Sequence, residues 1–251
     1  MIIVATHKDF NTSILEENYS PVQVGCFFTD VDLGFLKDNI GTNISEKNKS
    51  YCELTALYYA WKNKSKNKKY LGLAHYRRLF VKDSFKAKIN ASKEVLTDSD
   101  INEILIDYDV ILPKKRFYPF TTVKQHYCQS HFEKDILLLE ELISNKYSEY
   151  SESFNSVVNS KSIHLYNMFV MKTELADEYC EWLFSVLFEL ESLVDISNYD
   201  SYQGRIFGFL SERLLNVWVH KNKLRVKELN VYEPDGRRYT EKALKYLKEY
   251  R

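Results

Sequence analysis

The chain has 251 residues, which at about 150 residues per domain predicts one large domain or a domain with a small lobe. Lys plus Arg and Asp plus Glu each number 35, so the formal charge is zero and no basic excess favours a nucleic-acid partner. The hydrophobic content of 45% excludes a disordered chain, and the 7 glycines form neither a dinucleotide-binding motif nor a P-loop. Side chains must therefore help to hold any bound phosphate.

The apolar runs are far shorter than the ~20 residues that cross a bilayer, and the N-terminus lacks the features of a signal peptide. The four cysteines form no C-x-x-C pair, so neither a zinc ribbon nor a redox dithiol is predicted. We therefore expect a reduced protein in the cytoplasm.

Strands and helices are predicted to alternate from the first residues onward. Apolar and β-branched runs predict strands at 2–6, 21–28, 69–75, 109–113, 164–172 and 225–232. Apolar residues at helical spacing predict helices at 50–63, from 97 or 98, at 122–143, at 175–190 and at 202–220. Ser50 and Glu53 have the spacing of a capping box for the first of these helices. The lysine-rich residues 82–93 are expected to form an exposed connection.

The alternation predicts an α/β fold, a mostly parallel central sheet flanked by helices, and no linker rich in Pro, Gly or Ser divides it. In such sheets ligands bind beyond the carboxyl ends of the strands. The residues expected there are Thr6, His7, Lys8, His75, Tyr76, Arg77, Arg78, Pro113, Lys114, Lys115 and Arg116, with Lys172 as a further candidate. Because most of them are cations or histidines in a neutral chain, we expect an anionic ligand at this edge.

Two adjacent arginines, Arg77 and Arg78, follow the strand at 69–75. On an extended segment they point to opposite sides, so we expect one to face a ligand and the other to pair with an internal carboxylate. The planar guanidinium group binds a diphosphate through two parallel hydrogen bonds, which suits this position to phosphate binding. A plain surface pair at the end of a strand is the alternative interpretation.

The helix at 202–220 carries polar residues beside its apolar stripe. Arg213 lies within the stripe, and a buried arginine needs a carboxylate inside the fold or a phosphate at a site. Arg205, Gly208 and Glu212 follow one edge of the stripe, and the glycine allows a ligand or another backbone to approach closely. Glu212 is either a base or nucleophile toward a sugar, or a member of a structural Arg–Glu pair.

The histidines do not predict a metal site. His126 and His131 are five residues apart, which does not place them on one helix face, and no H-E-x-x-H motif is present. His131 and Asp135 are four apart and are expected to share a face, as an acceptor contact or as a surface pair. Asp30 and Asp32 form a D-x-D triplet after a strand, which is a minor candidate for a divalent cation.

Five segments in order resemble one protein family: NIGTNISEKNKSYCELTALYYAWKN, YLGLAHYRRLF, YDVILPKKRFY, HLYNMFVMK and RIFGFLSERLLNVW. They are similar to a bacterial glycosyltransferase family long known as a domain of unknown function, whose members occur among capsule, exopolysaccharide and lipopolysaccharide synthesis proteins. The similarity runs from about Ile2 to Tyr232. Five ordered motifs are far more specific than any one of them alone.

The resemblance implies a GT-A-like, Rossmann-type fold and transfer of a sugar from a nucleotide donor, with UDP favoured and galactofuranosyl or galactosyl transfer as candidates. In the wider GT-A class a D-x-D strand end holds a metal ion, and GLAHYRR occupies that place here. Arg77 and Arg78 are therefore expected to hold the diphosphate without a metal cofactor, and Glu212 to be the catalytic carboxylate. The implied donor-binding residues are Thr6, His7, Lys8, Asn43, Ser45, His75, Tyr76, Asn167 and Arg205. Asn43 and Ser45 could instead simply fix their turn.

His131 and Lys114 are the acceptor-binding candidates. The implied partners are a nucleotide-sugar donor and a lipid-linked or oligosaccharide acceptor, with the protein held at the inner face of the membrane through residues 82–93 or a C-terminal helix. We expect one glycosyltransferase domain over 1–251, with a core at 2–232 and a helical tail at 233–251. A non-catalytic glycan-binding module is the alternative function; it predicts sugar binding without nucleotide binding. The sequence does not indicate an oligomeric state.

Overall fold

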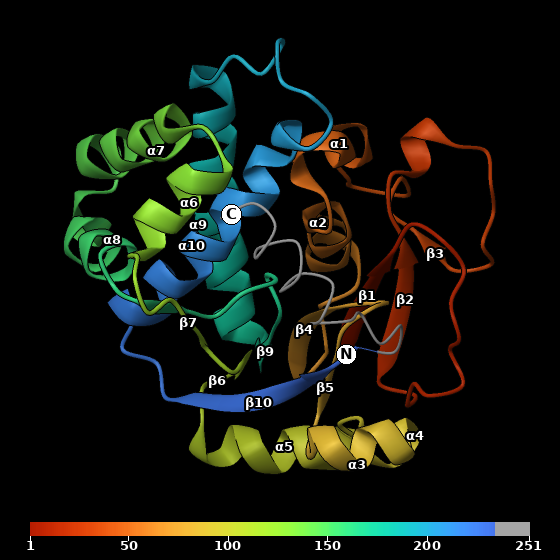
Figure 1. Ribbon diagram of the computed structural model, residues 1–251. Coiled ribbons are helices and arrows are strands. Elements are labelled where there is room, and N and C mark those ends of the chain that lie inside the picture. Colours follow the sequence, from red (N-terminus) through yellow and green to blue (C-terminus); the bar gives the residue numbers. More distant parts are fainter. Residues whose placement is uncertain (234–251) are drawn as a thin grey trace, which may run out of the picture.

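The computed structural model describes residues 1–233, and the expected helical tail beyond them lies outside the described residues. A central sheet of eight strands has the order β3-β2-β1-β4-β9-β6-β10-β5 (Figure 1). Its strands are β1 (Ile2–Thr6), β2 (Tyr19–Gln23), β3 (Leu36–Lys37), β4 (Tyr70–His75), β5 (Leu79–Val81), β6 (Val110–Pro113), β9 (Phe169–Lys172) and β10 (Val226–Tyr232). A separate ribbon pairs β7 (Arg116–Phe117) with β8 (Ser162–Ile163).

The α-helices of the described chain cover both faces of the sheet (Figure 1). They are α1 (Asn48–Tyr51), α2 (Leu54–Asn63), α3 (Ser84–Ile89), α4 (Ala91–Glu94), α5 (Asp98–Asp107), α6 (Val123–Ser130), α7 (Glu133–Lys146), α8 (Ser151–Val158), α9 (Thr173–Leu193) and α10 (Ile206–Lys221). No helix in residues 1–233 is long and apolar enough to cross a bilayer.

The sheet is buried on both sides, which explains the unbroken apolar runs of its strands. In β1, Ile3 packs into the core under α2, α9 and α10, while Ile2 and Val4 pack into the second core under α3 and α5. This alternation follows from the two-residue period of a strand. The predicted fold, a mostly parallel sheet flanked by helices, is confirmed.

Strand direction decides which residues reach the edge of the sheet where a ligand is predicted to bind. β1, β2, β4, β6 and β10 share one direction, so their carboxyl ends lie at one edge, whereas β9 is antiparallel to β4 and β6. The start of β9, with Asn167 just before it, therefore lies at that edge. Lys172 pairs with Tyr70 at the opposite edge, so the prediction that Lys172 joins the site is wrong.

The helix predicted at 50–63 is divided. Cys52 has a φ of 53°, which ends α1, and α2 begins two residues later. The predicted capping box is absent: the Ser50 hydroxyl donates to the Lys47 carbonyl, and the Glu53 side chain makes no cap contact. The box does form at α5, where the Thr97 side chain caps the helix together with Asp100.

Four other predicted segments differ in their bounds or content. The helix predicted at 122–143 is two helices, because His131 has an extended backbone between α6 and α7. The strand predicted at 164–172 begins only at Phe169, and residues 26–28 form a 3-10 helix rather than the end of a strand. The connection at 82–93 contains α3 and most of α4, and the buried strand β5 before it was not predicted.

Candidate functional site

A cleft of about 820 Å³ opens at the carboxyl edge of β1 and β4. Its walls come from the ends of these strands, from α1 and from the segment before α10. It brings together seven of the predicted site residues: Thr6, His7, His75, Tyr76, Arg77, Arg78 and Arg205. Residues separated by up to two hundred positions in the sequence thus meet in one concavity.

The lining of the cleft is rich in cations. Lys49, Arg77, Arg78 and Arg205 face two carboxylates, Glu53 and Asp200. Burial lowers the pKa of His7, and the nearby positive charges lower it further, with the strongest effect from Arg77. This imidazole is therefore neutral at pH 7. The lining thus has more positive than negative groups, which favours an anionic ligand over a cationic one.

The two arginines lie in a tight turn rather than on an extended segment. The backbone amide of Arg78 donates to the carbonyl of His75, so the chain reverses directly after β4. Both arginines line the cleft, in contrast to the predicted opposite orientation. The Arg78 guanidinium lies 3.2 Å from the Glu233 carboxylate and 4.1 Å from the Tyr166 ring centre. One of the pair does therefore meet a carboxylate, as predicted.

A strained turn precedes β9. Tyr166 and Asn167 have φ angles of 78° and 54°, a left-handed conformation that is uncommon for residues other than glycine. The amide of Tyr166 donates to Glu212, and its carbonyl accepts a 2.6 Å hydrogen bond from Nε2 of His75. Burial lowers the pKa of His75, so the ring stays neutral while it makes this contact. Strain maintained by polar contacts of this kind is typical of functional sites.

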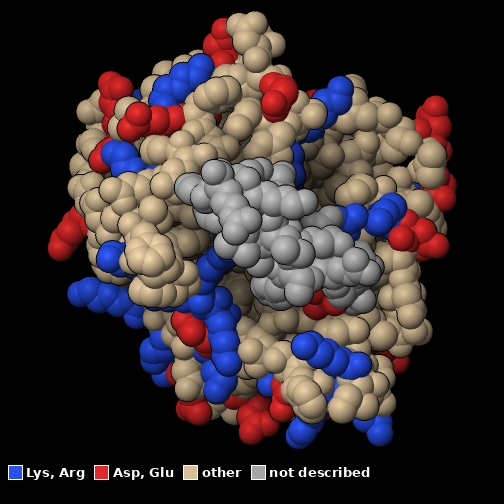
Figure 2. Space-filling view, in the orientation of Figure 1, with Lys and Arg blue, Asp and Glu red and all other residues tan. Residues whose placement is uncertain are grey.

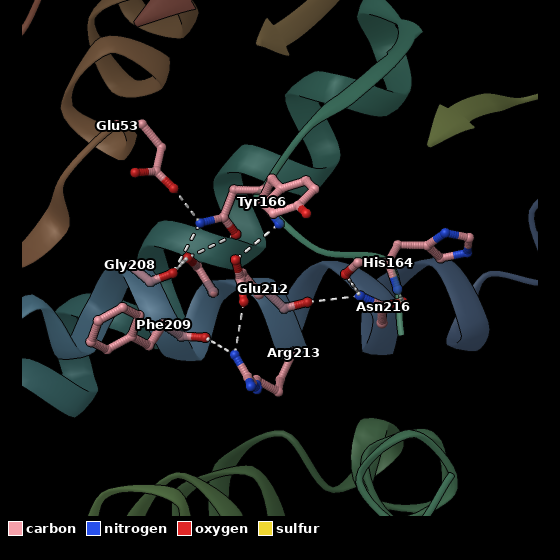
Figure 3. A network of polar contacts seen from close by, with 10 residues as sticks. Glu53, His164, Tyr166, Gly208, Phe209, Glu212, Arg213 and Asn216 are labelled. Carbon is pink, nitrogen blue, oxygen red and sulfur yellow. Dashed lines mark hydrogen bonds and ion pairs between the residues drawn. The ribbon is translucent and has the colours of Figure 1, made fainter. Parts of the chain in front are cut away.

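The Asn167 side chain ties the turn to two helices. Its amide group donates to the Glu53 carboxylate at 2.7 Å and to the Gly208 carbonyl at 2.9 Å, while its oxygen accepts from the Ser211 hydroxyl (Figure 3). This network joins the start of α2, α10 and the start of β9. Glu53 lines the cleft, whereas Asn167 and Glu212 lie outside its lining. Asn167 is thus held in one orientation by its neighbours.

Glu212 lies at the centre of the same network (Figure 3). One carboxylate oxygen accepts from the Tyr166 amide and the other from Nη1 of Arg213, each at 2.9 Å. Burial raises the pKa of Glu212, and the positive charge of Arg213 partly opposes that shift. The predicted internal carboxylate for buried Arg213 is therefore confirmed, and the guanidinium also lies over the Tyr127 ring.

Glu53 is a residue of the cleft that the sequence pattern concealed. Its S-x-x-E spacing indicated a cap, but the break at Cys52 turns its side chain toward Asn167 and the cleft. Gly208 allows this packing, because a Cβ there would lie 3.2 Å from the Cys52 sulfur. Nε of Arg205 also lies 3.2 Å from that sulfur. The close approach predicted for Gly208 is confirmed, and the approaching segment is the α1–α2 break.

Thr6 lines the cleft from a buried position, and its hydroxyl donates to the Lys8 carbonyl. Ser45 and Asn43 have separate surroundings. Ser45 is buried and donates to Asp38, and Asn43 accepts from the Ser45 amide, so their contacts are those of a fixed turn. Neither lines the cleft, and their part in donor binding stays a prediction.

Lys114 is exposed after β6, and it also lies outside the cleft lining. His131 packs against Tyr202 and Phe209, with ring centres 5.6 and 4.1 Å away. The helix face predicted for His131 and Asp135 is wrong, because the chain bends between them and Asp135 accepts from Tyr199 instead.

The acidic triplet after β2 is not part of the cleft. Asp32 accepts from Lys37 at 2.9 Å, and neither Asp30 nor Asp32 contributes to the cleft lining. Within residues 1–233 no three or more His, Cys, Asp or Glu side chains are arranged to hold a metal ion. Arginine side chains, rather than clustered carboxylates, are the polar groups at the end of β4.

These features define an α/β protein with a cation-lined cleft at the carboxyl edge of its sheet. The same fold occurs in the apo structure of WbbM, a bifunctional glycosyltransferase, with a TM-score of 0.80 and 29% sequence identity. The match covers 92% of this chain and 45% of the WbbM chain, so the present chain spans less than half of that protein.

A family model described as a domain of unknown function, DUF4422, matches residues 1–223, and the chain belongs to this family. No curated protein matches the chain.

Proposed function

We propose that the protein is a glycosyltransferase that moves a sugar from a nucleotide donor to a glycan acceptor. The observation that carries this proposal is the cation-lined cleft at the carboxyl edge of a fold shared with a glycosyltransferase structure. UDP is the proposed nucleotide, and surface-polysaccharide synthesis is the proposed setting, with galactofuranosyl or galactosyl transfer as the first activities to test.

The donor diphosphate is proposed to lie against Arg77, Arg78 and Arg205, with Thr6, His7, Lys8 and Tyr76 near the nucleotide. In the reaction the bond between the anomeric carbon and the diphosphate oxygen breaks, and its electron pair leaves with the nucleoside diphosphate. Guanidinium groups that already point at this oxygen stabilise the developing negative charge. Arginines at the end of β4 would thus perform the role that a bound metal ion performs in other transferases.

Two carboxylates are proposed to take part in the reaction. Both oxygens of Glu212 accept hydrogen bonds, one from the Tyr166 amide and one from Arg213, which suits a residue that holds the turn before β9 in position. Glu53 lines the cleft, and its Oε2 has no hydrogen-bond partner among residues 1–233. We therefore assign to Glu53 the removal of the proton from the acceptor hydroxyl as that oxygen bonds to the anomeric carbon.

The acceptor is proposed to approach from the side of His131. Tyr202 and Phe209 pack against this ring, and Tyr202 is half exposed, so together they form an aromatic surface on which a sugar ring can stack. Lys114 is proposed as a second contact with the acceptor. Asn167 is proposed to meet the donor sugar from the start of β9.

Calorimetric titration with UDP tests this function, run once with manganese and once with excess chelator. Equal binding in both runs is the expected result, followed by transfer or hydrolysis with UDP-sugars. Binding only with manganese would transfer the diphosphate to an acidic site and refute the arginine assignment. Binding of glycans without any nucleotide binding would instead support the non-catalytic glycan-binding module.

A further inference from the structure

Residues 114–121, the basic aromatic loop, project from the carboxyl end of β6. The surrounding residues 110–132 contain four Lys or Arg and no Asp or Glu, in a chain whose formal charge is zero. Lys114, Lys115 and Arg116 are all exposed. Figure 2 shows Lys and Arg side chains gathered on the side of the molecule where Figure 1 labels β6 and β7.

Large aromatic side chains stand among these cations. Phe117 is 64% exposed and Phe120 is 91% exposed, the largest exposed fraction of the bulky apolar residues in the described chain. Exposure of single apolar residues is ordinary, but two phenylalanines surrounded by cations on one projecting loop form a patch. Such a patch matches a partner that is apolar beneath a negatively charged surface.

The loop packs on a small core of its own. Phe117 in β7 pairs with Ser162 in β8, and the next residue, Tyr118, packs with Val123 and Ile163. The Tyr118 ring stacks on His126 with ring centres 4.1 Å apart. Because Tyr118 anchors the loop from inside, Phe117 and Phe120 are directed outward without the loop having to be ordered on binding.

We propose that the basic aromatic loop docks the protein on the surface of an anionic lipid bilayer. Lys115 and Arg116 would attract the negatively charged headgroups, and Phe117 and Phe120 would enter the boundary between headgroups and acyl chains. Electrostatic attraction and apolar burial then act together, and the combination is what gives a surface-bound protein usable membrane affinity.

The position of the loop connects the membrane to the site. The Tyr118 ring stacks on His126 of α6, and the next residue of α6, Tyr127, has its ring centre 5.1 Å from the guanidinium of Arg213, which pairs with Glu212. The inner side of the loop therefore leads through α6 to the Glu212 network. A glycan attached to a lipid in the bilayer would reach the carboxylates of the site from this side. This last step rests on the proposed function, whereas docking itself does not.

Helix α3 supplies a matched control. Phe85 and Ile89 are four residues apart and similarly exposed, and Lys86 and Lys88 lie between them. However, acidic Asp83 and Glu94 flank this segment, and α3 packs with the core on the face of the sheet opposite to α10. Variants in α3 therefore also test the sequence-based prediction that residues 82–93 hold the protein at the membrane.

The experiment is cosedimentation of the protein with vesicles of phosphatidylglycerol and phosphatidylcholine, and with vesicles of phosphatidylcholine alone. We expect binding to the anionic vesicles only, weakened by salt. Replacing both cations (Lys115→Ala with Arg116→Ala) should lower the partition coefficient about thirtyfold, from ~1 kcal/mol for each basic residue. Phe120→Ser should lower it about tenfold. The control Phe85→Ser with Ile89→Ser should leave it unchanged.

UDP titration of each variant separates the two proposals, since loop variants should keep the parent affinity for UDP. Vesicle binding that survives the loop variants, or that is lost in the α3 control instead, would overturn the docking assignment. So would the absence of any vesicle binding. A loop variant that changes only the oligomeric state in light scattering would show that the loop contacts a second copy of the chain, which also overturns the proposal.

Discussion

Replacement of Glu212 by Gln should destabilise the protein strongly, although the two side chains have the same shape. Glu212 accepts one hydrogen bond from the Tyr166 amide and one from Arg213. A glutamine has one oxygen and one NH2 group, so in either orientation a donor faces a donor. The Arg213 side chain is only 4% exposed, which leaves its cation buried without a carboxylate.

The magnitude follows from the partial burial of the pair. Breaking a buried ion pair by removing one partner costs about 3–5 kcal/mol, and the 19% exposure of Glu212 points to the lower end, about 3 kcal/mol. A domain is stable by only about 5–15 kcal/mol, so this loss is a large fraction of the total. With a urea dependence of about 3 kcal/mol per molar, the unfolding midpoint should fall by about 1 M.

Urea unfolding of three variants measures the effect. Glu212→Gln combined with Arg213→Met should recover most of the stability, because no buried cation remains. Arg213→Met alone should cost less than Glu212→Gln, and still less as the pH falls, because burial already raises the pKa of Glu212 and a protonated carboxyl needs no cation. A Glu212→Gln protein within about 0.5 kcal/mol of the parent would refute the reasoning, since that is the range of ordinary surface substitutions.

Three further predictions concern the cleft and its surroundings. Arg77→Ala and Arg78→Ala should each weaken UDP binding about tenfold or more, as for loss of a hydrogen bond to a charged group, because both side chains line the cleft. Mild losses in calorimetry for both variants would contradict this assignment. Glu53→Gln keeps an oxygen for Asn167 but loses the base, so turnover should fall about a hundredfold or more with UDP binding retained, and near-parent turnover would remove Glu53 from the mechanism. The pKa of His126 is lowered from 6.5 to about 4, mainly by burial, so the unfolded chain binds more protons and stability is lost as the pH falls from 6.5 toward 4. His126→Phe should show a smaller loss over that interval in unfolding titrations, and an unchanged slope would refute the assignment.

The fold could be predicted because each strand and helix has its own local spacing of apolar residues, which can be read from the sequence. Apolar runs predicted β1, β4, β6 and β10, and the confirmed burial of Arg213 beside a carboxylate followed from its position in an apolar helix stripe. Boundaries were less predictable. The helix break at Cys52 and the bend at His131 have no periodic signal. Both residues contact the segment before α10, Cys52 through Arg205 and His131 through Gln203.

The residues of the site were likewise predictable in part. Thr6, His75 and Arg77 were expected at the carboxyl edge because parallel strands deliver their ends to one edge whatever the rest of the fold does. The place of Glu53 in the cleft was not predicted. Its spacing from Ser50 indicated a helix cap, whereas the backbone break at Cys52 turns its carboxylate toward the cleft.

The sequence by itself therefore determined the alternation of strands and helices, the edge at which polar residues gather and the neutral overall charge. Only the tertiary structure decided that β9 runs antiparallel, which brings Asn167 to the site and takes Lys172 away from it. It also decided that Glu53 and Glu212, 159 positions apart in sequence (212 minus 53), both contact the turn of Tyr166 and Asn167 before β9. The physical reason is that strand direction and side-chain partners are set by packing between distant segments, and local periodicity carries no information about them.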